Sequence, residues 1–167
     1  MIEELRKYIK NNYEKPKRIF RKAKARAIQE DYEMCCAEVG SAYADINTFI
    51  KQKDKYNDFQ TMLFKLIDER NLKDSDVYNK VHIDRRLFSK IRNDNTYHPS
   101  KETIILLGLS LELNEYEIEE LLNSASYSLP KNNYYDLIIR FCFINKIYKL
   151  IEVNSLLEEY NCKLFSY

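Results

Sequence analysis

Residues 84–93 of the chain read Asp84-Arg85-Arg86-Leu87-Phe88-Ser89-Lys90-Ile91-Arg92-Asn93. In a helix, where successive side chains turn by about 100°, Leu87, Phe88 and Ile91 share one face. The rest of the surface carries four cations and one hydroxyl, from Arg85, Arg86, Ser89, Lys90 and Arg92. Asp84 stands directly before this run, and its short carboxylate is suited to cap a helix. We therefore predict a short helix that buries three apolar residues and presents a basic face.

The composition predicts an all-α fold without a membrane span. The 167 residues include only 2 Gly and 3 Pro, so a fold built on tight hairpins is not expected, and good helix formers are common. No apolar run approaches the roughly 20 residues that a membrane-spanning helix needs. Acidic residues at 3 and 4 stand where a secretory signal carries basic ones, so we expect a cytoplasmic protein.

The chain lacks the residue patterns of a metal centre or a catalytic site. Its cysteines include no Cys-x-x-Cys pair, and they are Cys35, Cys36, Cys142 and Cys162. With only His82 and His98 to assist them, reduced thiols are a better expectation than a zinc site. Neither histidine has a matching nucleophile, and no glycine-rich phosphate loop is present. We expect a non-enzymatic protein that holds no metal and no cofactor.

Charge is unevenly distributed along the chain. Residues 1–57 carry 13 Lys/Arg against 9 Asp/Glu, a net +4. Residues 58–130 carry 9 against 13, a net −4, and residues 131–167 carry 5 against 4, a net +1. A surface that binds phosphate needs local positive charge. The basic decapeptide therefore lies in the most acidic third of the chain, which counts against nucleic-acid binding.

Apolar periodicity predicts further helices around the decapeptide. They are expected over residues 2–13, after a cap at Asp58, and over 74–81, 100–111 and 114–125. The segment 100–111 is apolar nearly all round, so it should be central. Ser100 is placed to cap that helix, and Asn114 with Glu117 three residues later matches a capping box,.

The pattern divides the chain into three parts. Residues 1–57 form a basic N-terminal helix and linker segment, 58–130 a five-helix domain, and 131–167 a helical extension. The segments 136–144 and 151–160 are too apolar to stand alone in water. They must pack on the domain, on the N-terminal segment or on a second copy of the chain. A β-strand over 137–144 is the alternative to a helix there.

The stretch 59–125 resembles the phage-repressor class of helix-turn-helix proteins, the Cro/C1-type or Xre-like family with a lambda-repressor-like fold. The resemblance rests on residues 72–91, on Pro99-Ser100 and on the Leu-rich helix that follows. Residues 131–167 also resemble an extension in uncharacterised bacterial proteins of this class. The resemblance implies a dimer whose second motif helix enters the major groove of DNA. Arg85, Arg86 and Ser89 would then face base edges, while Lys90 and Arg92 would approach phosphate or the groove wall.

Four residues depart from the pattern of that class. Tyr78 replaces a small residue that lets the two helices approach each other. His82 replaces a turn glycine at a position that often needs positive φ, which histidine tolerates better than a β-branched residue. Asp74 and Asp84 replace donors near the DNA backbone, where a carboxylate repels phosphate. These departures leave the predicted fold intact and weaken the prediction of DNA binding.

Two functions therefore remain open. In the first, the protein is a transcriptional regulator that binds double-stranded DNA. The basic run then adds accessory phosphate contacts from Lys17, Arg18, Arg21 and Lys22,. The alternative for that run is a solvated connector. In the second, the domain is an adaptor that recognises a protein partner through its apolar C-terminal helices and an acidic face. That face comprises Glu112, Glu115, Glu117, Glu119 and Glu120. A homodimer is compatible with both.

Overall fold

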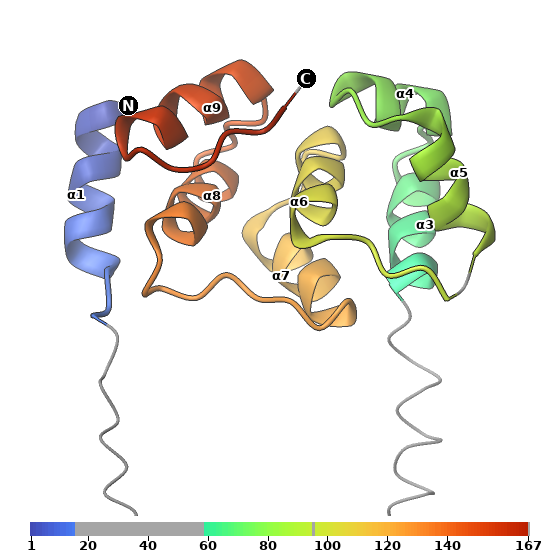
Figure 1. Cartoon of the computed structure of the whole chain (residues 1–167), viewed down its shortest axis with the longest axis horizontal. Helices are drawn as coiled ribbons and strands as arrows, with labels where there is room; N and C mark the ends of the chain where they lie inside the picture. The colour runs from blue at the N-terminus through green and yellow to red at the C-terminus, as the bar shows by residue number, and fades with distance from the viewer. Residues whose placement is uncertain (16–58, 95, 167) are drawn as a thin grey trace, which may run out of the picture. The chain divides into compact units, whose positions relative to one another are not determined.

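A computed structural model describes residues 1–15, 59–94 and 96–166 of the chain. These residues belong to one compact unit, made of residues 1–15 and 58–167 (Figure 1). Within the described residues there are eight α-helices and no strand, which confirms the all-α expectation for this part of the chain. None of these helices is long and apolar enough to cross a membrane. The basic run at Lys17, Arg18, Arg21 and Lys22 and the predicted cap at Asp58 lie outside the described residues.

The helices follow the predicted order with small shifts at their ends. Their bounds are α1 Ile2–Asn12, α3 Phe59–Glu69, α4 Asp74–Lys80, α5 Arg85–Asn93, α6 Lys101–Ser110, α7 Glu115–Ser124, α8 Tyr134–Ile144 and α9 Leu150–Glu159. The segment 137–144 is helical, so the alternative of a β-strand there is wrong.

Short polar side chains cap four of the described helices: three at the predicted residues, and α8 at Asn133, which was not predicted. The Asp84 carboxylate accepts a hydrogen bond of 2.6 Å from the Arg86 N–H. The Ser100 hydroxyl accepts one of 3.2 Å from the Thr103 N–H. Asn114 forms the full capping box, in which the Glu117 carboxylate in turn accepts from the Asn114 N–H at 2.8 Å. Each cap satisfies backbone donors that the first helical turn leaves without a partner.

Six helices end on a residue with positive φ that is not glycine. These residues are Asn71, His82, Glu112, Ser126, Lys146 and Asn161, with φ between 50° and 60°. After each one, the next N–H reaches back to a carbonyl in the last helical turn, as from Ile147 to Cys142 at 2.8 Å. This is the Schellman arrangement, which usually employs glycine because a Cβ is strained in the left-handed region.

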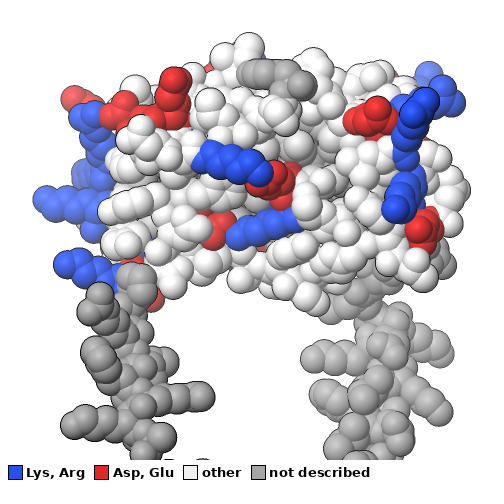
Figure 2. All heavy atoms as spheres, viewed as in Figure 1, with Lys and Arg blue, Asp and Glu red and all other residues white. Residues whose placement is uncertain are grey.

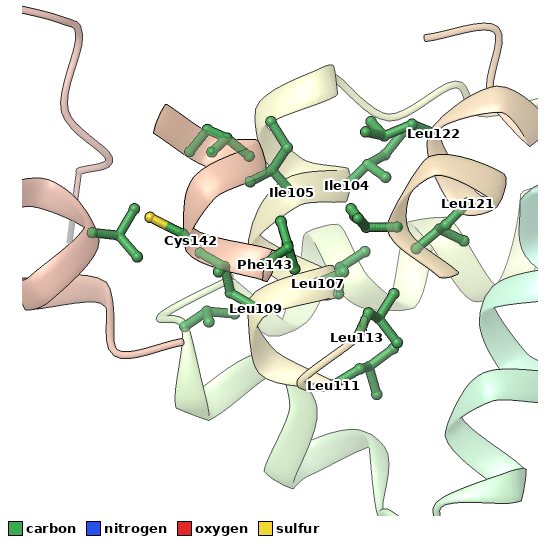
Figure 3. Packing of buried hydrophobic residues seen from close by; sticks show 14 of the residues in the cluster. Ile104, Ile105, Leu107, Leu109, Leu111, Leu113, Leu121, Leu122, Cys142 and Phe143 are labelled. Carbon is green, nitrogen blue, oxygen red and sulfur yellow. The ribbon is translucent and has the colours of Figure 1, made fainter. Parts of the chain in front are cut away.

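The core is built around α6, which is buried on every side. Ile104, Ile105, Leu107 and Leu109 are each 0% exposed, and Figure 3 shows them packed among side chains of the neighbouring helices. Gly108 allows a close approach on the same helix. A Cβ there would lie 2.5 Å from Ile118 Cδ1 on α7 and 3.2 Å from Phe143 Cζ on α8. The expectation of a central helix over 100–111 is confirmed.

The N-terminal helix packs on the C-terminal extension. Helix α1 contacts α8, and α8 also contacts α7 and α9. The Tyr8 ring lies 5.4 Å from that of Phe141, and the Tyr13 ring stacks on that of Tyr134 at 4.7 Å. The sequence pattern grouped residues 1–15 with 16–57, whereas the structure groups them with 58–167. The apolar residues of α8 are thereby buried inside the unit, namely Leu137, Ile138, Ile139, Phe141, Cys142 and Phe143.

Replacing a residue of positive φ by glycine should stabilise the fold. Lys146 is exposed, has φ 55° and makes no ion pair among the described residues. Lys146→Gly relieves left-handed strain at the end of α8, so we expect the free energy of unfolding to rise by about 0.5–1 kcal/mol. Denaturant unfolding measures this change.

Two matched variants control for the effect of glycine itself. Lys146→Ala keeps a Cβ and should leave stability within about 0.5 kcal/mol of the wild type. Glu120→Gly, inside α7, should destabilise by about 0.5–1 kcal/mol because glycine is a poor helix former. A Lys146→Gly protein as destabilised as Glu120→Gly would contradict the account of these helix ends.

Candidate nucleic-acid interface

Helices α4 and α5 are held together by a small apolar cluster. Val77 and Val81 on one side and Phe88 and Ile91 on the other are at most 2% exposed. The Phe88 ring lies 5.6 Å from that of Tyr78, so the tyrosine that replaces a small residue packs against its neighbour helix. Of the three residues predicted to be buried on α5, Phe88 and Ile91 are, whereas Leu87 is only half-buried. The predicted burial of Leu87 is thus only partly correct.

The turn between the two helices depends on His82. Its φ is 56°, which confirms that this position takes a positive φ. The Ile83 N–H then donates to the Tyr78 carbonyl at 2.9 Å, and Ile83 is buried. Asp84 follows and caps α5. Its carboxylate therefore has a structural role at the start of the basic helix, in addition to its charge.

The basic residues of α5 divide between two sides of the helix. Arg85, Ser89 and Arg92 line a groove of about 410 Å³ between α4 and α5, together with Lys73 and Asp74. Arg86 and Lys90, which are four residues apart on the helix, do not line this groove. The structure thus brings three of the five predicted contact residues together and places the other two beside them. Figure 2 shows Lys and Arg side chains over α4 and α5, on the right of the view, with acidic side chains next to them.

Lys73 is a member of the groove that the sequence analysis missed. It is the residue directly before α4, and its side chain makes no capping hydrogen bond. The only sequence signal was a cation immediately preceding the first of the two helices. Lys73 reaches the groove because α4 packs against α5, a contact that the sequence pattern alone does not report.

Three of the five predicted contact residues already have partners within the unit. The Ser89 hydroxyl accepts a hydrogen bond of 3.1 Å from the Asn93 side-chain amide. The Arg92 guanidinium lies 2.5 Å from an Asp74 carboxylate oxygen and 4.1 Å from the centroid of the Phe64 ring. Lys90 Nζ lies 4.4 Å from the centroid of the Tyr97 ring. Exposed ion pairs contribute about 0.2–1 kcal/mol, and exposed cation–π contacts about 0.5–1 kcal/mol. Arg92 is therefore oriented by two interactions, whereas Lys90 forms no ion pair among the described residues, although its charge helps to lower the pKa of Asp94.

Ion pairs separate the cations of residues 59–130 into two groups. Five form ion pairs within the unit, namely Lys65, Arg70, Lys80, Arg92 and Lys101. The other four have no ion pair among the described residues, and they are Lys73, Arg85, Arg86 and Lys90. All four lie on α5 or directly before α4. Within residues 59–130, the cations without an ion pair to a described residue therefore lie on one helix pair; others lie elsewhere in the unit, as at Lys7 and Lys10 of α1 and at Lys146.

The acidic face predicted around α7 is largely neutralised inside the unit. Glu117 lies 2.8 Å from Arg70, and Glu112 lies 2.5 Å from Lys80. Arg140 on α8 pairs with both Glu115 and Glu119. Glu120 is the one member of the face without an ion pair among the described residues. The net −4 of residues 58–130 already includes Arg70 and Lys80, and Arg140 is the one cation among these partners that lies outside the region.

Hydrogen bonds and charge set the ionisation of this face. Partial burial raises the pKa of Glu117, but the Asn114 N–H and the Arg70 guanidinium together lower that pKa below its ordinary 4.5. Burial lowers the pKa of Arg140, yet hydrogen bonds and charge from Glu115 and Glu119 raise it overall. Glu117 and Arg140 are consequently charged at neutral pH, and each is bonded to its own partners on this face.

The Cys142 thiol and the His98 ring, which were candidates for chemistry, are held by burial and by a hydrogen bond. Burial raises the pKa of the Cys142 thiol to about 12, so this thiol is protonated at neutral pH,. His98 Nε2 donates to the Ala125 carbonyl at 2.9 Å. Among the described residues, no cluster of three or more His, Cys, Asp or Glu side chains could hold a metal ion.

Comparisons with protein families, with curated proteins and with solved structures find no match to this chain. The role of the α4–α5 surface therefore has to be argued from its residues and their geometry.

The capping box on α7 predicts a pH-dependent stability. The pKa of Glu117 is lowered in the folded protein, so its carboxylate stabilises the fold above its unfolded pKa, and this contribution is lost as the pH falls through the folded pKa,. We expect Glu117→Gln to lower the free energy of unfolding by about 1 kcal/mol at neutral pH. Denaturant unfolding at a series of pH values should show the difference from the wild type shrinking below the ordinary value of 4.5.

Glu120→Gln is the matched control, since it removes the same charge from the same helix without breaking an ion pair among the described residues. It should change stability by less than about 0.5 kcal/mol at any pH. Equal effects of the two substitutions would show that Glu117 is not specifically bonded.

Proposed function

We propose that the protein is a helix-turn-helix transcriptional regulator that binds double-stranded DNA with α5 in the major groove. The observation that carries this proposal is a group of four cations on or beside α4 and α5 that form no ion pair with any described residue, namely Lys73, Arg85, Arg86 and Lys90. Phosphate contacts release condensed counterions and supply much of the affinity for DNA. Cations that already neutralise an acid must lose that partner first, so the unpaired ones are the residues best suited to this role.

The groove residues suit the reading of base edges. Arg85 and Ser89 line the space between α4 and α5, and Arg86 is exposed beside them. A bidentate Arg contact to guanine is the commonest specific contact in the major groove, and Ser can bond to either kind of base pair. We assign base contacts to Arg85, Arg86 and Ser89, and phosphate contacts to Lys73 and Lys90. The resemblance would bring Arg92 to phosphate or the groove wall. In this proposal Arg92 makes no DNA contact, and its guanidinium pairs with Asp74 instead.

The adaptor alternative draws less support from the structure than from the sequence. Its acidic face is occupied by ion pairs to Arg70, Lys80 and Arg140. The apolar residues of its C-terminal helices are mostly inside the core. Among the described residues after 130, the large hydrophobic side chains left exposed are Tyr134, Ile144, Ile151 and Leu164. We therefore favour DNA. A homodimer, which the resemblance to the Cro/C1-type class implies, would make the expected site a palindrome.

Selection of bound duplexes from a random pool tests the proposal. The wild type should enrich a defined sequence at near-physiological salt. Arg85→Ala/Arg86→Ala should abolish the enrichment, because losing two base contacts at about 1–3 kcal/mol each lowers affinity by at least tenfold. Titration of the selected duplex measures that loss directly.

Lys7→Ala/Lys10→Ala is the matched control. It removes the same charge from α1, where neither lysine forms an ion pair among the described residues. This variant should select the same sequence as the wild type. If the wild type enriches nothing, or if both double variants weaken binding equally, the α4–α5 surface is not a base-reading interface.

A further inference from the structure

We propose that Asp74 is a positioning residue that withholds Arg92 from nucleic-acid phosphates and so limits non-specific binding. This inference rests on the proposed function and assigns a selectivity role within the same surface. It concerns the one ion pair among the residues that line the α4–α5 groove. That pair joins the first residue of α4 to the last turn of α5.

Arg92 is fixed by partners on two other helices. Asp74 lies 18 residues earlier in the chain, and its carboxylate oxygen is 2.5 Å from the guanidinium. Phe64 of α3 presents its ring 4.1 Å from the same group. The two charged side chains are 43% and 37% exposed, so solvent and a polyanion can reach the pair. Arg92 therefore lies at the surface but already has an acidic partner.

The pair changes what the groove can bind. A phosphate that approaches Arg92 also meets the Asp74 carboxylate, and repulsion between the two anions offsets the attraction to the cation. The other cation lining this groove on α5, Arg85, has no acidic partner among the described residues. Of the three cations that line the groove, Lys73 and Arg85 thus stay available, and Arg92 does not. A duplex that offers only phosphates gains less from this surface than one that offers a matching base edge to Arg85.

The salt dependence of binding to a random-sequence duplex measures the effect. In Asp74→Asn the carboxylate is gone and Arg92 is released. The slope of log K against log salt should steepen by about 0.9 for each added phosphate contact. Asp76→Asn removes the same charge from the same helix, and Asp76 forms no ion pair among the described residues. It should leave the slope at the wild-type value.

Arg92→Gln completes the design. In the wild-type background it should leave the slope unchanged, because Arg92 makes no phosphate contact there. In the Asp74→Asn background it should remove the gained contact. The proposal is overturned if Asp74→Asn and Asp76→Asn behave alike, or if Arg92→Gln alone flattens the wild-type slope by about 0.9.

Heparin, a polyanion without bases, separates this inference from the proposed function. If no variant binds duplex DNA, the proposed function fails, and elution of the full-length proteins from immobilised heparin still tests the role of Asp74. Asp74→Asn should then elute at higher salt than Asp76→Asn. The double variant Asp74→Asn/Arg92→Gln should elute at no higher salt than Asp76→Asn. Equal elution of the two single variants, including no retention of either, would refute the withholding of Arg92.

Discussion

The structure depends on the burial of α6. A helix that is apolar on all sides gains free energy only where other helices cover every face, at about 25 cal/mol for each Å² of apolar surface removed from water. Helices α4 and α7 contact α6 directly, and α5 is attached through its contact with α4. Gly108 removes the side chain that would hold α7 and α8 away. The position of the basic helix is therefore a consequence of how α6 is enclosed.

Ion pairs divide the cations of residues 59–130 into those with and those without an acidic partner among the described residues. Around α7 the acids are bonded to cations from α3, α4 and α8. Two of these pairs and three others join five of the nine cations of residues 59–130 to acids. The remaining four form no ion pair among the described residues, and they are Lys73, Arg85, Arg86 and Lys90. The net −4 of residues 58–130 is unchanged by pairs within that region, so a count along the sequence does not report where the cations without ion pairs lie,.

Local features of this fold could be predicted from the sequence, and contacts between distant residues could not. The caps at Asp84, Ser100 and Asn114 depend on residues within one helical turn. The docking of α1 on α8 joins residues over a hundred positions apart, as in the Tyr8–Phe141 contact, and no periodicity reports it. Helix ends at residues such as Lys146 carried no glycine signal. The Asp74–Arg92 pair likewise required the fold, since its members are 18 residues apart.

The central claim is that the cations without ion pairs on α4 and α5 form a nucleic-acid interface. Changes in backbone-amide chemical shifts on titration with a DNA duplex at low salt test it most directly, because they report contact residue by residue. The account predicts that, within the described unit, the largest changes fall within residues 72–93. Changes centred on residues 112–120 or on α9, or no changes at all in this unit, would contradict it.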